Sequence, residues 1–196
     1  MKKGHLYTAG FMIVLSAVLT FALALAYESF KPMIAGHKEL AEKRAVLYAL
    51  GLDAGLSGDQ VLTQYDQLIK PGENSELGVL TQAEDGVLKA YAVPFEGAGL
   101  WGTIRGYLGV SAELDQIKGV VFTAQNETPG LGGRIDEEVY KQQFRGIPID
   151  EETYLKYGSS EGYELDAVTG ATQTSKAVLR MLNQLLDETI YSGEVR

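Results

Sequence analysis

At 196 residues, the chain is long enough for one compact domain of about 100 to 150 residues with an appendage. From Glu28 onward it holds all 26 acidic residues but 15 of the 17 basic ones, a formal charge of −11 that disfavours nucleic acid and anionic lipid headgroups as partners. It has no cysteine, and its 2 histidines are His5 and His37. This excludes disulfides, iron–sulfur clusters, thioether-linked haem, a Ser-His-Asp triad and a His-rich metal site from the folded domain. A cofactor, carboxylates and hydroxyls remain as sources of chemistry.

The N-terminal segment predicts a transmembrane anchor over residues 1–30. From Leu6 to Tyr27 no residue is charged, and Lys2 and Lys3 precede this stretch. A helix of that length reaches about 33 Å, which is enough to cross a bilayer. The alternative is a cleaved signal peptide, because the small-residue sites Ala-Leu-Ala at 22–24 and 24–26 suit signal peptidase. The apolar stretch is longer than a usual signal core, which favours the uncleaved anchor.

The orientation of the anchor is predicted with the N-terminus in the cytoplasm and the domain on the outer side of the cell membrane. Lys31, Lys38, Lys43 and Arg44 follow the segment, so the count of positive charges alone favours the reverse. Long domains, however, translocate largely regardless of charge.

Residues 31–75 predict a helical stalk and connector. The stretch "GHKELAEKRAVLYALGL" over 36–52 reads as a helix that ends at Gly51. This helix either continues the membrane segment or is separated from it by a break at Lys31-Pro32. In "SGDQVLTQYDQLIKPGEN" over 57–74, Ser57 or Asp59 caps a second helix, which the Pro-Gly pair at 71–72 ends.

Residues 76–196 predict an α+β sandwich with a C-terminal packing helix. The β-type runs "GVLKAYAVPFE", "GLWGTIRGYLGVS" and "IKGVVFTAQ" suggest an antiparallel sheet. A short helix follows over 134–146, with Asp136 as its cap and with Ile135, Val139, Tyr140 and Phe144 packing inward. A strand lies within 160–168, and an amphipathic helix runs from about Ser175 to Tyr191. Strands followed by a packing helix, without βαβ alternation, are typical of this class.

Two glycine-rich segments lie within the predicted sheet region. "ETPGLGG" over 127–133 reads either as a turn or as a binding loop, and its glycine spacing does not fit a dinucleotide fingerprint. "GAGLWG" holds Trp101, the only tryptophan. Its indole is either a core residue or a neighbour of a flat ligand, because the flanking glycines let a ligand approach the backbone closely.

The stretch "DAVTGATQTSKAV" over 166–178 places four hydroxyls before the last helix, on Thr169, Thr172, Thr174 and Ser175. A structural interpretation makes Thr174 or Ser175 the helix cap, worth about 1 kcal/mol. One cap needs one hydroxyl, so the others stay unexplained. The free amides of a helix N-terminus favour an anion, especially a phosphate.

These segments carry a resemblance. "DAVTGAT" resembles the flavinylation signal of proteins that hold FMN through a phosphoester to a threonine, and "ETPGLG" and "GLW" are similar to further segments of the same family, in the same order. The family is the covalent-FMN subunit of Rnf-type and Nqr-type ion-translocating oxidoreductase complexes (the RnfG/NqrC family, with an FMN-binding domain). The resemblance covers Gly86 to the C-terminus.

The resemblance implies site residues. Thr172 is the attachment threonine, and the flavin transferase reads the residues before it. Further residues lie against the flavin or support it, with Trp101 as a neighbour. The implied cofactor-binding set besides Thr172 comprises Asp166, Thr169, Gly170, Ala171, Thr174, Glu127, Thr128, Pro129, Gly130, Leu131, Gly132 and Trp101.

The implied function is electron transfer between neighbouring membrane subunits, with no complete reaction in this chain alone. The short chain favours the Rnf type (ferredoxin:NAD oxidoreductase), whereas "GAGLWG" is nearer to the Nqr type (NADH:quinone oxidoreductase). The rival hypothesis is an anchored interaction or sensing domain without a redox cofactor. A hydrolase is disfavoured, because the domain lacks a histidine base and a clear nucleophile.

Overall fold

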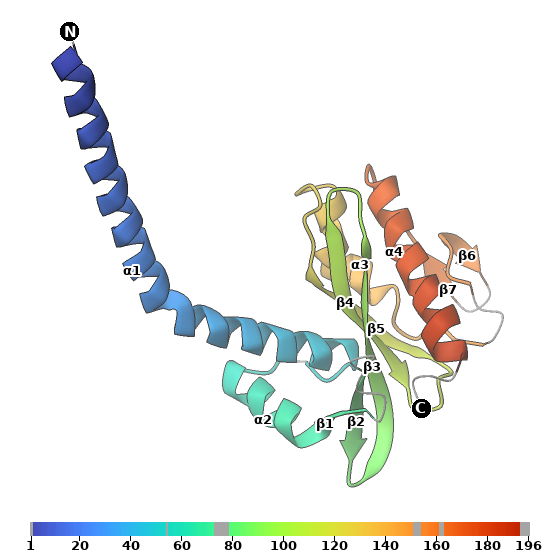
Figure 1. The fold of residues 1–196 in the computed structure, drawn as a ribbon. Coiled ribbons are helices and arrows are strands. Elements are labelled where there is room, and N and C mark those ends of the chain that lie inside the picture. Colours follow the sequence, from blue (N-terminus) through green and yellow to red (C-terminus); the bar gives the residue numbers. More distant parts are fainter. Residues whose placement is uncertain (1, 54, 73–78, 151–153, 161–162, 193–196) are drawn as a thin grey trace. The chain divides into compact units, whose positions relative to one another are not determined.

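The computed structural model describes residues 2–53, 55–72, 79–150, 154–160 and 163–192. The chain divides into two compact units, Met1–Glu39 and Leu40–Arg196 (Figure 1). The first unit is entirely helical in its described part, and the second holds the sheets and the remaining helices.

Helix α1 (Lys2–Ala49) runs through the predicted anchor without a break. Pro32 lies inside it, so the predicted interruption at Lys31-Pro32 does not end the helix, and the continuous alternative is confirmed. In the described part of the chain, α1 is the one helix long and apolar enough to cross a membrane. Its apolar side chains in the first unit are exposed to the surroundings, as a bilayer-facing surface requires.

The last turns of α1 belong to the second unit and are buried there. Val46, Leu47 and Leu50 pack with Val61 and with residues of the sheet. Gly51 has a φ of +77°, the left-handed conformation that ends many helices, so the predicted stop is confirmed. The segment predicted as a stalk therefore contributes to a core. The division into residues 1–30, 31–75 and 76–196 stays a proposal.

Helix α2 (Gly58–Leu68) begins at the predicted cap, Ser57, which forms a capping box with Gln60. It ends earlier than the predicted Pro-Gly stop, because the chain turns at Ile69 into the short strand β1 (Ile69–Pro71). Strand β1 is absent from the sequence-based prediction.

The main sheet has five antiparallel strands in the order β1-β2-β3-β4-β5. Three of them are predicted from the sequence, and these are its three longest strands: β3 (Val87–Ala98), β4 (Thr103–Ser111) and the edge strand β5 (Ile117–Ala124). Strand β2 (Leu80–Glu84) pairs with β1 on one side and with β3 on the other, and it is also absent from the sequence-based prediction. Strands β3 and β4 pair from Ala90↔Ser111 up to Ala98↔Thr103, so their connection lies at one tip of the sheet.

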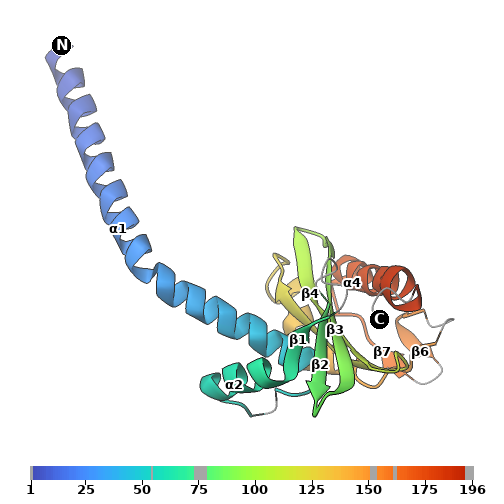
Figure 2. The same ribbon diagram turned by 60° about the horizontal axis from the view of Figure 1, so that its bottom comes forward.

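Alternation along β3 gives the sheet two covered faces. Tyr91, Val93 and Phe95 point into the larger core under α4 (Thr172–Leu185), whereas Ala90 and Ala92 face α1 and α2. The two views of Figures 1 and 2 show α4 on one side of the sheet and α2 on the other. The α+β class with a final packing helix is confirmed.

Between β5 and α4 lie η2 (Gly132–Asp136), α3 (Glu138–Gln142), β6 (Gly158–Ser160) and β7 (Tyr163–Leu165). The predicted cap Asp136 is wrong, since the residue before α3 is Glu137 and the Asp136 carboxylate accepts a hydrogen bond from Gln125. The inward position predicted for Val139 is also wrong, because its side chain is 79% exposed. Helix α4 starts three residues before the predicted Ser175 and continues as a π-helix, η3 (Leu186–Tyr191).

Candidate functional site

Three segments singled out in the sequence meet at one end of the domain. They are the β3–β4 connection with Trp101, the segment after β5 that begins at Glu127, and the start of α4 with Thr172 (Figure 1). The sheet tip brings the first two together, and α4 packs against β3 with its N-terminus at the same end. Segments 26 residues (Trp101 to Glu127) and 45 residues (Glu127 to Thr172) apart in the chain therefore form one site.

The carboxylate of Glu127 links all three segments. Its Oε1 accepts hydrogen bonds from the backbone amides of Leu100 at 2.9 Å and of Trp101 at 3.0 Å. Its Oε2 accepts a short hydrogen bond from the hydroxyl of Thr174 in the first turn of α4. Glu127 is 4% exposed, so these donors replace the water that a charged carboxylate would otherwise bind.

Two glycines make this close packing possible. A Cβ on Gly99 would lie 2.5 Å from Oε1 of Glu127, and one on Gly132 would lie 2.6 Å from the hydroxyl of Thr174. Gly170 has a φ of +78°, which turns the chain just before α4. The resemblance implies that Gly132 lies against the flavin and that Gly170 belongs to the sequence read by the flavin transferase. In the structure, Gly132 leaves space for the Thr174 hydroxyl and Gly170 provides a turn.

The loop before α4 is held by its own hydrogen bonds. The hydroxyl of Ser175 accepts from the amide of Val168 at 3.0 Å, and the amide of Ala171 donates to the Val168 carbonyl at 2.9 Å. The amide of Asp166 donates to Oε1 of Gln143 at 2.6 Å. The N-cap residue of α4 is Ala171, without a side-chain cap, so neither Thr174 nor Ser175 caps the helix. The structural interpretation of the four hydroxyls is therefore wrong.

The hydroxyl-bearing residues differ in accessibility. Thr174 and Ser175 are buried, at 1% and 0% exposure, whereas Thr169 and Thr172 are exposed. Thr172 is the first residue of α4, where helix amides are not yet used by the helix itself. An anionic group on the Thr172 hydroxyl would therefore meet a favourable helix terminus.

Apolar side chains lie open at this end of the domain. Leu100, Trp101 and Leu131 are 54%, 69% and 45% exposed, so the interpretation of Trp101 as a core residue is wrong. Leu131 contacts the turn at Gly170, since a Cβ built there would lie 3.2 Å from its Cδ2. Thr128, Pro129 and Gly130 are exposed beside it in a turn closed by the Leu131 amide and the Thr128 carbonyl. The three apolar side chains can cover a flat aromatic ligand.

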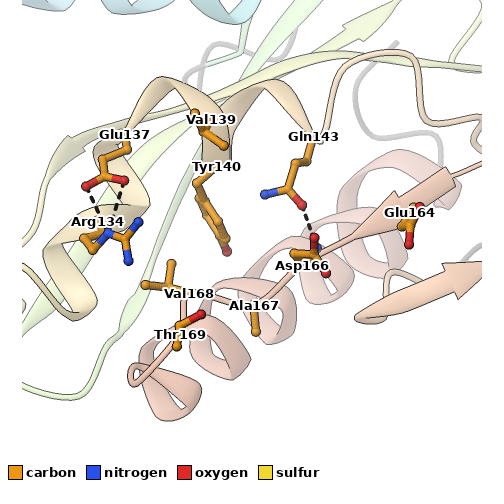
Figure 3. A pocket seen from close by; sticks show the side chains of 10 residues that line it. All are labelled: Arg134, Glu137, Val139, Tyr140, Gln143, Glu164, Asp166, Ala167, Val168 and Thr169. Carbon is orange, nitrogen blue, oxygen red and sulfur yellow. Dashed lines mark hydrogen bonds and ion pairs between the residues drawn. The ribbon is translucent and has the colours of Figure 1, made fainter.

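A pocket of about 360 Å³ lies beside the loop before α4 (Figure 3). Asp166, Ala167, Val168 and Thr169 form one wall with Glu164. The facing wall consists of Arg134, Glu137, Val139, Tyr140 and Gln143. Arg134 is paired with Glu137 at 3.0 Å, which leaves the Asp166 and Glu164 carboxylates to give the pocket an acidic character.

Tyr140, a buried residue of the pocket lining, is hydrogen-bonded to the partly buried Tyr157. Burial raises the pKa of Tyr140 well above its usual value and also raises the pKa of Tyr157. Both phenols are therefore protonated at neutral pH. The Tyr157 hydroxyl donates to the Ser175 carbonyl at 2.9 Å and lies 2.8 Å from the Tyr140 hydroxyl. This chain of bonds ties α3 to the first turn of α4.

Three residues that build the site are absent from the set predicted from the sequence. Gln143 holds Asp166, Leu100 contributes apolar surface, and Ser175 fixes the loop instead of capping a helix. A signal for Ser175 was present in the hydroxyl cluster itself. Gln143 had none, because its partner is 23 residues away and the contact depends on the tertiary fold.

The residues present fit an FMN group. An exposed hydroxyl at a helix N-terminus suits a phosphoester, and neighbouring exposed apolar side chains suit an isoalloxazine ring. The resemblance implies that Glu127 belongs to the cofactor-binding set. In the structure, its carboxylate accepts hydrogen bonds from donors of the protein itself.

Comparison with known proteins gives the same cofactor. Residues 99–187 match the family model of the FMN-binding domain. Among curated proteins, the chain is 34% identical over 106 residues to the NqrC subunit of the Na(+)-translocating NADH-quinone reductase of Neisseria meningitidis serogroup A, covering 50% of this chain and 41% of that protein. It is 31% identical over 113 residues to the same subunit of Vibrio campbellii, covering 54% and 43%. The chain thus spans less than half the length of these relatives.

Two solved structures share the fold. The NqrC subunit of the Na(+)-translocating NADH-quinone reductase from Parabacteroides distasonis superposes with a TM-score of 0.66 and 26% identity, over 82% of this chain and 94% of that one. NqrC of Shewanella oneidensis superposes with a TM-score of 0.62 and 24% identity, over 72% and 88% of the two chains.

Proposed function

We propose that the chain is an FMN-binding subunit of the RnfG/NqrC family, that it carries FMN as a phosphoester on Thr172, and that it relays electrons within a membrane-bound, ion-translocating redox complex. The observation that carries the proposal is the exposed Thr172 at the start of α4, beside the open apolar surface of Leu100, Trp101 and Leu131. The flavin supplies the electron-transfer chemistry when it is bound.

The chain's own residues then have separate roles. Asp166, Thr169, Gly170 and Ala171 present the sequence that a flavin transferase reads, on a loop whose backbone is held by Ser175 and Gln143. A phosphoester prevents the loss of the cofactor by dilution, because it keeps the flavin at a fixed effective concentration on the protein. The apolar surface excludes water from one face of the ring.

Peptide mapping tests the proposal directly. The full chain, co-expressed with a flavin transferase, is separated on a denaturing gel, and the fluorescent band is digested with trypsin. The peptide between Lys156 and Lys176 should gain the mass of one FMN less one water, with Thr172 as the modified residue. A dark band, obtained with a transferase that modifies a control substrate, would support the interaction or sensing domain instead.

The type of complex remains a choice between two. The relatives described above are NADH-quinone reductase subunits, so they give no support to the Rnf preference and lean toward the Nqr type. We propose the Nqr type as the first candidate. Membranes that contain a tagged chain would be solubilised, and the co-purified subunits assayed for NADH:quinone and for ferredoxin:NAD activity. Ferredoxin-dependent reduction of NAD alone would return the assignment to the Rnf type.

The proposed sidedness can be measured because the chain has no cysteine. Val139→Cys places a single thiol on the domain at a position that is 79% exposed, and His5→Cys places one near the N-terminus. With the domain outside, an impermeant maleimide should label the first variant in intact spheroplasts and the second only after lysis. The opposite pattern would reverse the orientation, as the count of positive charges suggests.

A further inference from the structure

The environment of Glu127 is unusual for a buried carboxylate. Its two oxygens accept three hydrogen bonds, all from neutral donors, and within the described residues no lysine, arginine or histidine forms an ion pair with it. Burial of a carboxylate without a cation lowers stability unless hydrogen bonds to its oxygens replace those that water would make. These bonds join three separate segments at the sheet tip.

The turn between β3 and β4 depends on these bonds. Within the turn itself, the Gly99 amide donates to the Gly102 carbonyl at 2.8 Å. The amides of Leu100 and Trp101 both point inward to Glu127, while their side chains point to the exterior with 54% and 69% exposure. A side chain so exposed is held in place by its backbone, because little protein packs against it.

The third bond sets the distance between that turn and the attachment threonine. Thr174 lies two residues after Thr172 in the same helical turn, and its buried hydroxyl binds the same carboxylate as the two amides. Gly132 packs against the contact between Thr174 and Glu127, since a Cβ on Gly132 would lie 2.9 Å from both Cβ and Oε2 of Glu127. The carboxylate is therefore the shared point of the sheet tip, the 127–133 segment and α4.

We propose that Glu127 is the positioning residue of the flavin site, and that it acts through these hydrogen bonds and not through contact of its charge with the ring. It holds the Leu100–Trp101 turn beside the first turn of α4, so that the two apolar side chains form a fixed surface for the ring of a group attached to Thr172. The inference rests on the proposed function for the identity of that group. The arrangement of the chain itself does not depend on it.

The first measurement uses the full chain in detergent without flavin. Trp101 is the only tryptophan, so its fluorescence anisotropy decay reports the mobility of this turn alone. Glu127→Ala removes all three bonds and should increase the amplitude of the fast, local component. Glu127→Gln should resemble the wild type, because its amide oxygen can still accept from both backbone amides and its NH₂ can donate to Thr174. Glu96→Ala removes an exposed carboxylate of the same strand end and serves as the matched control.

The second measurement uses the flavinylated chain. With the ring on the Leu100–Trp101 surface, Glu127→Ala should lengthen the flavin fluorescence lifetime and lower its anisotropy, while Glu127→Gln and Glu96→Ala leave both unchanged. Thr174→Val removes only the hydrogen bond to Oε2 of Glu127 and keeps the side-chain shape nearly constant, so it should change the flavin lifetime and anisotropy by an intermediate amount. This variant also tests the inference if Glu127→Ala does not fold.

Several outcomes would overturn the inference. Unchanged Trp101 anisotropy in both Glu127→Ala and Thr174→Val would mean that the bonds do not hold the turn. Equal changes of the Trp101 and flavin fluorescence in Glu127→Gln and Glu127→Ala would mean that the effect comes from the charge of the Glu127 carboxylate and not from its hydrogen bonds. Failure of the proposed function is distinguished from these outcomes, because it would leave the wild type without flavin but would not alter the measurements on the flavin-free chain.

Discussion

Replacing Thr172 by alanine should abolish covalent flavin. Thr172 is the exposed hydroxyl at the N-terminus of α4, and the two hydroxyls that follow it are buried and hydrogen-bonded within the protein. No neighbouring residue in that helical turn can therefore take its place as the acceptor. The measurement is flavin fluorescence in a denaturing gel, normalised to total protein, after co-expression with the transferase.

Two control variants separate the loss of the acceptor from damage to the site. Thr172→Ser keeps a hydroxyl at the same position and should retain the fluorescent band. Thr174→Val changes a buried hydroxyl two residues away and should also retain it. A band of undiminished intensity in Thr172→Ala would move the attachment to another residue, for which exposed Thr169 is the nearest candidate.

The second large effect concerns stability. Phe144 is fully buried beneath α3 and makes an edge-to-face contact with Tyr140 at a centroid distance of 5.5 Å. Phe144→Ala deletes a buried ring and leaves a cavity, which should lower the free energy of unfolding by about 3–5 kcal/mol. Urea unfolding of the full chain in detergent, followed by circular dichroism, measures this loss.

Val139→Ala is the matched control from the same predicted apolar stripe. Its side chain is 79% exposed, so the substitution should change the free energy of unfolding by at most about 0.5 kcal/mol. Similar losses in both variants would contradict the packing described for α3, since the structure buries one of these side chains and exposes the other.

Some elements could be predicted because their signal is local. The β-branched and aromatic residues from Val87 to Phe95 and from Ile117 to Phe122 define two long strands, and Gly51 ends α1 where the sequence places its stop. Strand β1 was missed because Ile69 continues the helical pattern of α2, and only pairing with β2 makes it a strand. Val139 was misplaced because the segment from 132 begins as a 3₁₀-helix, which shifts the side-chain directions.

The candidate site also has a part that could be predicted from the sequence and a part that could not. The motifs located Thr172 and the Glu127 segment, because they are short and contiguous in the sequence. The arrangement of hydrogen bonds could not be predicted, since Glu127 binds residues 26, 27 and 47 positions away. Tryptophan is often a core residue, and only the fold shows that the backbone of Trp101 is held inside while its indole stays outside.

The burial of the last turns of α1 also determines where this protein can be divided. Val46 and Leu47 are fully buried against the sheet face that carries Ala90 and Ala92. These helical turns therefore cover the smaller core, on the side of the sheet opposite α4. A fragment that begins after the two N-terminal helices would present that face to water, and an uncovered apolar sheet face promotes aggregation. The smallest independent folding unit therefore begins near Leu40, within the helix whose N-terminal part is the predicted anchor.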